Sequence, residues 1–189
     1  MYLTTILIML VIIVYIQYYI NYKPDFKINQ IYLDQFKINL LYEKYPIIIY
    51  DKLIEPKDLL KTFFAYSYNI SDDFPILFDN KVTINLSKYQ IIYNQLADID
   101  INLIHPKYRS QIEFSTNTNL NNTKKILLSK EPLSKLNVEY VTVKLKKNKI
   151  FILPTYWIYN SNLPVQTIML DDYMSYMVSK IYKFMLAKR

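Results

Sequence analysis

The pattern of apolar and polar positions divides the chain into one uninterrupted apolar run and a longer region of short alternating segments. From Leu3 to Ile20 the run contains no charged side chain. A helix over this run rises about 27 Å, close to the roughly 30 Å hydrocarbon core of a bilayer. Its Leu, Ile and Val residues favour insertion by about 3 to 7 kcal/mol. The pattern predicts a transmembrane anchor over residues 1–22, with the lipid bilayer as its partner.

A cleaved signal peptide is the alternative interpretation of this run. Signal peptides have a basic region before the apolar segment and small residues at a cleavage site after it. This chain has neither feature, so an uncleaved single-pass anchor is favoured. Lys23 and Lys27 follow the span, and the positive-inside tendency therefore places the C-terminal domain in the cytosol.

After the anchor, the pattern predicts a stalk over residues 23–42 and one folded domain over residues 43–189. Pro56 and the apolar residues after it predict a helix at 55–66. Ser87 and Gln90 have capping-box spacing, and with an apolar i, i+3, i+4, i+7 pattern they predict a helix at 87–98. A third helix follows Asp171 and Asp172, with an apolar stripe typical of a core face or of a dimer seam with a protein partner: Met174, Met177, Val178, Ile181 and Met185.

The remaining apolar segments are short and rich in Ile, Val and aromatic residues, which favours strands. The polar run at 116–125 indicates a loop. The chain is therefore expected to be mainly β with added helices, an α+β sandwich or barrel. The expected strands lie near residues 75–78, 82–86, 99–104, 111–114, 138–145, 150–153 and 165–170.

Composition excludes several kinds of site. The 189 residues include no Gly and no Cys. Phosphate-binding P-loops, dinucleotide fingerprints and nucleophile elbows need the backbone freedom of Gly, and thiolate nucleophiles and zinc fingers need Cys. The heavy use of Ile, Asn, Lys and Tyr is typical of an AT-rich genome, such as that of a large DNA virus, a parasite or a bacterium.

The single histidine, His105, narrows the chemistry further. One imidazole cannot build a two-His-one-carboxylate iron site or a three-His zinc site. A Ser-His-Asp triad remains formally open, with Ser110 as the nearest serine in sequence. The net charge of +7 comes from lysines scattered along the chain, with one dense cluster at 144–149. A nucleic-acid surface needs a contiguous patch, so no nucleic-acid partner is expected.

The segment "VTVKLKKNKIFILPTYWIYNSNLPVQTIML" resembles the closing part of the cupin-like JmjC family. Members of that family are jelly-roll oxygenases that use iron and 2-oxoglutarate. Their closing segment has a strand, a Gly-Asp turn, an apolar strand, a Pro, a Trp and a His that is the third metal ligand. Asn148 stands at the turn Gly here, Pro154 and Trp157 keep their places, and Tyr159 stands where the ligand His belongs. The resemblance implies a cupin-like double-stranded β-helix, or jelly roll.

The same resemblance implies that the metal site is lost. A neutral phenol is a poor ligand for a ferrous site built for imidazole and carboxylate. The family's first two ligands form an H-x-D or H-x-E pair, and the only histidine here begins "HPK", with Lys107 in place of the carboxylate. Asn148 tolerates a left-handed conformation, so the turn can survive without Gly.

The sequence therefore favours a membrane-anchored, non-catalytic cupin-like domain without a cofactor, acting in binding or assembly. Two alternatives stay open. An enzyme with an atypical metal site would use carboxylates, and a glycan or lipid binding module would use the abundant tyrosines. The carboxylate candidates are Asp72, Asp73, Asp98, Asp100 and Glu113.

Overall fold

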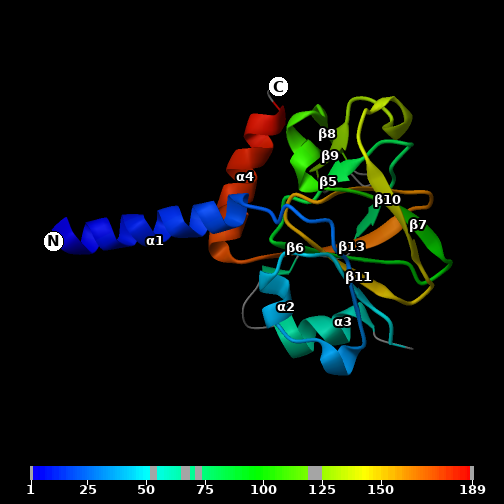
Figure 1. Ribbon diagram of the computed structural model, residues 1–189, viewed down its shortest axis with the longest axis horizontal. Coiled ribbons are helices and arrows are strands. Elements are labelled where there is room, and N and C mark those ends of the chain that lie inside the picture. The colour runs from blue at the N-terminus through cyan, green and yellow to red at the C-terminus, as the bar shows by residue number, and fades with distance from the viewer. Residues whose placement is uncertain (1, 52–54, 65–68, 71–73, 119–124, 188–189) are drawn as a thin grey trace.

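The chain folds into a β-sandwich that carries a long N-terminal helix (Figure 1). The computed structural model describes residues 2–51, 55–64, 69–70, 74–118 and 125–187. Helix α1 (Tyr2–Ile20) projects away from the sandwich, and helix α4 (Tyr173–Ala187) ends the described chain. The fold is mixed α+β with two large sheets, as the short apolar segments predict.

Both sheets are antiparallel within the described residues, apart from the parallel pair β1 and β2. In spatial order the first sheet holds β1 (Asn29–Ile31), β2 (Ile47–Ile49), β11 (Ile150–Pro154), β6 (Tyr89–Tyr93) and β13 (Val165–Asp171), with β3 (Asn69–Ile70) and β4 (Phe74–Ile76) along the far side of β13. The second sheet holds β10 (Tyr140–Leu145), β7 (Ile99–Ile104), β12 (Ile158–Ser161), β5 (Thr83–Ile84), β9 (Lys125–Ser129) and β8 (Phe114–Thr118).

The strand pairs are nested along the chain. Strand β4 pairs with β13, β5 with β12, β6 with β11, and β7 with β10. The first of these eight strands thus pairs with the last, the second with the second from last, and so on inward. The hairpin β8–β9 is inserted between β7 and β10 and extends the second sheet beside β5.

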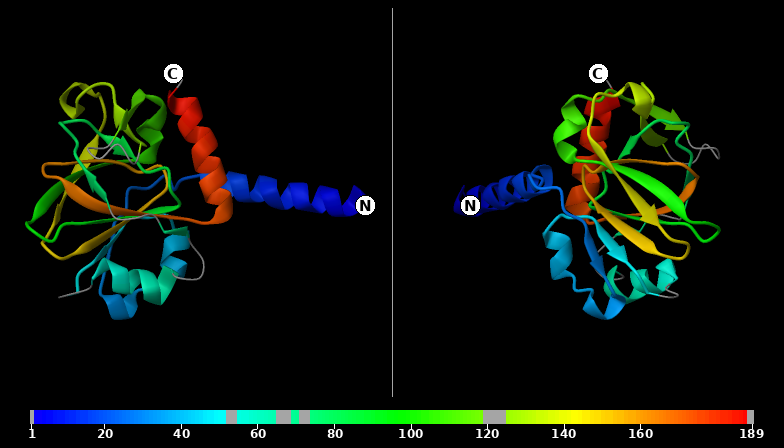
Figure 2. Two further views of the ribbon diagram at one scale, coloured as in Figure 1. Left: turned by 180° about the vertical axis from the view of Figure 1, so that it is seen from behind. Right: turned by 45° about the vertical axis from the view of Figure 1, so that its right-hand side comes forward.

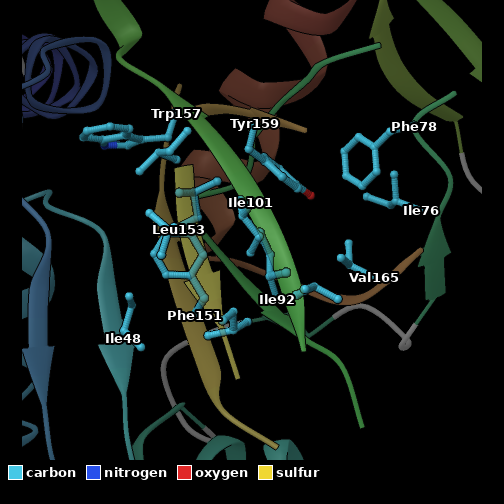
Figure 3. Close-up of a cluster of buried hydrophobic side chains, with 14 of the residues drawn as sticks. Ile48, Ile76, Phe78, Ile92, Ile101, Phe151, Leu153, Trp157, Tyr159 and Val165 are labelled. Carbon is cyan, nitrogen blue, oxygen red and sulfur yellow. The ribbon is translucent and has the colours of Figure 1, made fainter. Parts of the chain in front are cut away.

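Three apolar clusters hold the layers together. One lies between the two sheets and takes the inward side chains of both, such as Phe151 and Leu103. A second lies between the first sheet and the short helices that cover it. The third lies on the outer face of the second sheet, where Tyr19 of α1 and Val178 of α4 pack. Burial of both faces explains why strand β11 is apolar at every position (Figure 3).

Short helices occupy the outer face of the first sheet and the connections. They are η1 (Leu33–Gln35), α2 (Asn39–Tyr42), α3 (Pro56–Leu59), the π-helical η2 (Leu60–Phe64), η3 (Pro106–Ser110) and η4 (Leu133–Lys135). The segment 23–42, which the sequence assigns to a stalk, contributes strand β1 and the buried side chains of Phe36 and Leu41 to this layer.

The helix expected at 87–98 is wrong. Residues Tyr89–Tyr93 form the strand β6, which lies between β11 and β13. Tyr89, Ile91 and Tyr93 face the short helices, and Ile92 faces the second sheet. A strand buried on both faces shows apolar residues at consecutive positions, and these also fit a helical spacing by coincidence.

The other two helix predictions are confirmed, at α3–η2 and at α4, although residues 65–68 lie outside the described part of the chain. Asp172 caps α4, because its Oδ1 accepts a hydrogen bond from the backbone N–H of Ser175 at 2.7 Å. The strand expected at 111–114 begins only at Phe114, since η3 and a turn occupy the preceding residues. Strands β8 and β9 extend into the ends of the loop expected at 116–125.

Candidate functional site

Tyr159 lies in the middle of the cluster between the sheets. It sits on β12, is fully buried, and its ring packs edge-on against Phe78 with centroids 5.3 Å apart (Figure 3). Its hydroxyl accepts a hydrogen bond from Nε2 of the buried Gln90 at 2.8 Å. Burial raises the pKa of the Tyr159 hydroxyl well above its usual range, so the phenol stays neutral. The ring of Tyr159 therefore points into the space between the two sheets.

Trp157 lies two residues earlier, at the end of the sandwich from which α1 emerges. Its indole is buried and packs edge-on against Phe26 and His105, each with centroids 5.3 Å away. Its Nε1 donates a hydrogen bond to the carbonyl oxygen of Lys44 at 3.3 Å. The segment that follows α1 therefore covers this end of the sandwich with aromatic contacts.

Both ring nitrogens of His105 are engaged by backbone. Nε2 lies 2.9 Å from the carbonyl oxygen of Lys23, and Nδ1 accepts the N–H of Lys107 at 3.2 Å. Burial lowers the pKa of His105 below its usual value of 6.5, although the hydrogen bond to the Lys23 carbonyl acts to raise it. These bonds fit a neutral imidazole with its proton on Nε2, and they leave no nitrogen for Ser110 or for a metal. The triad that remained open in the sequence is not formed here.

The polar side chains of Thr83 and Asn85, on and directly after β5, also bond to backbone partners. Thr83 on β5 is the register partner of Tyr159, and its hydroxyl donates to the carbonyl of Leu127 at 2.7 Å. Asn85, fully buried, donates to the carbonyls of Leu153 and Pro154, each at 2.9 Å. These groups tie strands together, and an amide, a hydroxyl and a phenol do not fit a ferrous ion.

The last of the motif residues, Asn148, lies at the opposite end of the sandwich. It has φ of 61° in the turn between β10 and β11, so the predicted left-handed turn is confirmed. Its N–H donates to the carbonyl of Asn94 at 3.0 Å. Pro154 and Trp157 lie at one end of the sandwich together with His105. Asn148 lies at the other end, in the turn that joins β10 to β11.

Of the carboxylate candidates that the structure describes, Asp98 and Glu113 are exposed and Asp100 is half-buried. Asp98 accepts the N–H of Lys147 at 2.8 Å, and Glu113 pairs with Lys130 at 2.7 Å. Asp72 and Asp73 lie outside the described residues. Within the described part of the chain, no three Asp, Glu or His side chains come together as a metal site.

A pocket of about 200 Å³ opens beside the Trp157 end. Its rim carries Glu139, which accepts a hydrogen bond from the Tyr108 hydroxyl at 2.8 Å and pairs with Lys107 at 3.5 Å. The wall is aromatic and aliphatic, and the lining residues are Pro24, Phe26, His105, Lys107, Tyr108, Glu139, Tyr140 and Val141.

The C-terminal turn of α1 is built into the domain near this pocket. Tyr19 is only 3% exposed, packs edge-on against Tyr156, and donates its hydroxyl hydrogen to the carbonyl of Leu86. Arg109 donates to the carbonyl of Ile20 at 3.3 Å, and Lys44 donates to those of Tyr18 and Asn21. Cations are favourable at a helix C-terminus, where free carbonyls carry partial negative charge. Burial, together with the smaller effect of the neighbouring positive charges of Lys23 and Lys88, lowers the pKa of Lys44 to about 8.

A polar cluster joins α1, β6 and α4. Asp172 accepts the hydroxyl of Tyr15 at 2.6 Å and the ammonium of Lys88 at 2.6 Å. Burial raises the pKa of Asp172, but these two hydrogen bonds outweigh it and hold the pKa below its usual value. Its neighbour Asp171 accepts the N–H of Lys88 and the hydroxyl of Ser175, and burial raises its pKa. The cluster fixes the first turn of α4 against α1.

Sequence patterns did not indicate these contacts between the end of α1, the domain and the start of α4. The sequence predicts only a helix start at Asp171 and Asp172, and Lys44, Lys88 and Arg109 belong to no motif. Each of these side chains acts on a segment that is distant in sequence, so spacing along the chain carries no signal for the contacts.

No protein-family model matches the chain, and a search of curated proteins finds no match to it.

Proposed function

We propose that the protein is a single-pass membrane protein whose cytosolic cupin-like domain has lost metal chemistry and acts in binding or assembly, for instance in a viral membrane. One observation carries the proposal. Residues Leu3 to Val14 of α1 are a bare apolar helix, while its last turn is part of the domain core. Such a helix has no soluble partner among the described residues, and a bilayer is the solvent that suits it.

The packing of Tyr19 supports an anchor that is retained. Helix α1 is long and apolar enough to cross a membrane, a property that signal sequences share. Cleavage near Asn21 would remove Tyr19 from the cluster on the outer face of the second sheet, and with it the carbonyls of Tyr18 and Ile20 that accept hydrogen bonds from Lys44 and Arg109. Losing a buried aromatic side chain costs about 3 to 5 kcal/mol, a large part of the stability of a small domain.

The nested strand pairing supports a jelly roll. Eight strands paired first with last, and so on inward, describe one long hairpin rolled up into two sheets. In this arrangement β5 and β7 flank β12, so a metal ligand facing Tyr159 would come from one of them. Thr83 and Asn85 are the polar residues of that region on the β5 side, and neither is a ligand that iron prefers.

The buried hydrogen bonds of Tyr159 and His105 support a domain without oxygenase chemistry. Tyr159 fills the inter-sheet space that the resemblance assigns to the metal, and His105 is held by backbone on both nitrogens. What remains is a rigid scaffold held at a membrane surface, which suits display of a binding face.

The experiment uses the full-length chain expressed in membranes. We expect it to resist carbonate extraction and to keep its N-terminal residues by mass spectrometry. The matched variant Val11→Arg places a charge in the apolar run, which costs about 3 kcal/mol of insertion energy, and should be extracted more readily. A mature form that begins near Asn21 would overturn the anchor, and iron-dependent turnover of 2-oxoglutarate would overturn the non-catalytic assignment.

The pocket beside Trp157 favours a second candidate, a lipid or glycan binding module. Its aromatic wall and charged rim combine the features that hold amphipathic ligands. Native mass spectrometry of the full chain with phospholipids and with oligosaccharides tests this candidate. Tyr140→Ala, in the pocket wall, should weaken a bound species, whereas Leu96→Ala, at the other end of the sandwich, should not.

A further inference from the structure

Helix α4 presents an apolar face that nothing in the described part of the chain covers. Met174, Ser175 and Val178 face the domain. The outward side chains follow the spacing i, i+3, i+4, i+7 and i+8, which places them on one side of the helix. They are Tyr173 (73% exposed), Tyr176 (42%), Met177 (48%), Lys180 and Ile181 (61%).

This distribution is the reverse of what a surface helix normally shows. Two serines, Ser175 and Ser179, lie on the inner or half-buried side, and Met177 and Ile181 point outward. The apolar stripe that the sequence predicts as a core face or dimer seam is thus divided. Val178 faces the domain, whereas Met177 and Ile181 point outward. A surface helix with an outward apolar face indicates a partner that is itself apolar.

The position of α4 relative to α1 identifies that partner. Helix α4 lies on the side of the sandwich from which α1 projects, and it runs across the direction of α1 in each view (Figures 1 and 2). The Tyr15–Asp172 hydrogen bonds fix its first turn against α1. With α1 spanning a bilayer, α4 lies along the membrane surface with its outer face turned toward the lipid.

The length of bare helix brings the surface close enough for contact. The solvent-exposed part of α1, residues 3–14, rises only about 18 Å at 1.5 Å per residue, whereas the hydrocarbon core is about 30 Å thick. A short span is accommodated by thinning the bilayer or by drawing the flanking residues into it. Either adjustment moves the first turn of α4 to the depth of the lipid headgroups.

We propose that α4 is an interfacial helix that seats the domain on the bilayer in which α1 is anchored. Tyr173 and Tyr176 have the amphipathic rings that prefer the headgroup region, Met177 and Ile181 enter the acyl boundary, and Lys180 extends toward lipid phosphate. The inference rests on the proposed anchor and adds to it a defined orientation of the domain. The pocket beside Trp157 then opens near the membrane surface.

The absence of Cys allows single labels to test this orientation. The full-length protein is reconstituted in vesicles of equal parts phosphatidylcholine and phosphatidylserine, with an environment-sensitive fluorophore at one introduced cysteine. Met177→Cys reports on α4 and Ile8→Cys on the anchor. Leu96→Cys is the matched control, because Leu96 is 88% exposed and lies in the β6–β7 connection at the far end of the sandwich.

We expect nitroxide-labelled lipids to quench the labels at 177 and 8, with emission shifted to shorter wavelength, and to leave the label at 96 in an aqueous environment. Quenching at 8 without quenching at 177 would overturn the seating of α4 and leave the anchor standing. Absence of quenching at 8 would overturn the anchor and the seating together. A label at 177 that is shielded from aqueous iodide but unquenched by lipid would overturn the seating in favour of a second copy of the chain on this face.

A charge variant gives an independent measurement. Met177→Asp with Ile181→Asp changes two exposed side chains, so the fold should persist, and the label at Tyr173→Cys should lose its lipid quenching. Unchanged quenching at 173 in this variant would contradict an insertion driven by the apolar face.

Discussion

The hydroxyl of Tyr159 and the side-chain amide of Gln90 form a 2.8 Å hydrogen bond across the inter-sheet core, joining β12 of one sheet to β6 of the other. Both side chains are buried, so neither group has water as an alternative partner. The bond explains how a phenol can occupy the interior of a sandwich without leaving an unsatisfied polar atom.

Removing one partner of this bond should be costly. Tyr159→Phe leaves the Gln90 amide without its acceptor, and we expect a loss of about 1 to 3 kcal/mol in the free energy of unfolding, measured by denaturant titration. The double variant Tyr159→Phe with Gln90→Met should lose less than the sum of the single variants, because both polar groups are then absent. A Tyr159→Phe variant as stable as the wild type would show that the bond contributes nothing.

Introducing the histidine of the JmjC pattern at position 159 should not create a metal site. Tyr159→His places one imidazole opposite Thr83, and a ferrous ion needs further imidazole or carboxylate ligands. Metal analysis of the purified variant is expected to find no more iron than in the wild type. Stoichiometric iron in either protein would contradict the assignment of a lost site.

The left-handed turn at Asn148 gives opposite expectations for two substitutions. Asn148→Gly should be neutral or slightly stabilising, because Gly adopts φ of 61° without strain. A β-branched side chain clashes there, so Asn148→Val should cost about 1 to 2 kcal/mol. Thermal unfolding of the pair checks the difference, and equal stability of the two variants would remove the argument from backbone strain.

Trp157 should act through packing. Trp157→Ala deletes a buried indole that contacts Phe26 and His105, and the expected loss is about 3 to 5 kcal/mol in the free energy of unfolding. Leu96→Ala is the control, since a surface truncation usually changes stability by less than about 0.5 kcal/mol. Similar losses for the two variants would mean that the indole is not part of the core.

Acidification should destabilise the protein through His105. Its folded pKa lies below 6.5, so the unfolded chain binds more protons as the pH falls through 6.5 toward the folded pKa. Stability therefore decreases with falling pH across that window and is fully present above 6.5. His105→Gln should flatten this part of the stability profile. Because the chain has one histidine, the imidazole resonance in an NMR titration belongs to it alone, and a pKa above 6.5 would contradict the prediction.

Features that depend on a few neighbouring positions could be predicted from the amino-acid sequence. The apolar run of α1, the start of α4 after Asp172, most of the strands and the left-handed turn at Asn148 all follow from spacing or residue type over a few positions.

Features that depend on partners distant in the chain could not be predicted from local pattern. Tyr89–Tyr93 became a strand because β11 and β13 supply hydrogen-bond partners on both sides. Residues in the expected stalk entered the core because β2 was there to pair with β1. The contacts of Lys44 and Arg109 with the end of α1 also join segments that are distant in sequence. The outward orientation of the apolar side of α4 likewise depends on how this helix packs against the domain. Which surface a segment meets is set by the packing of whole layers, and local periodicity carries no information about it.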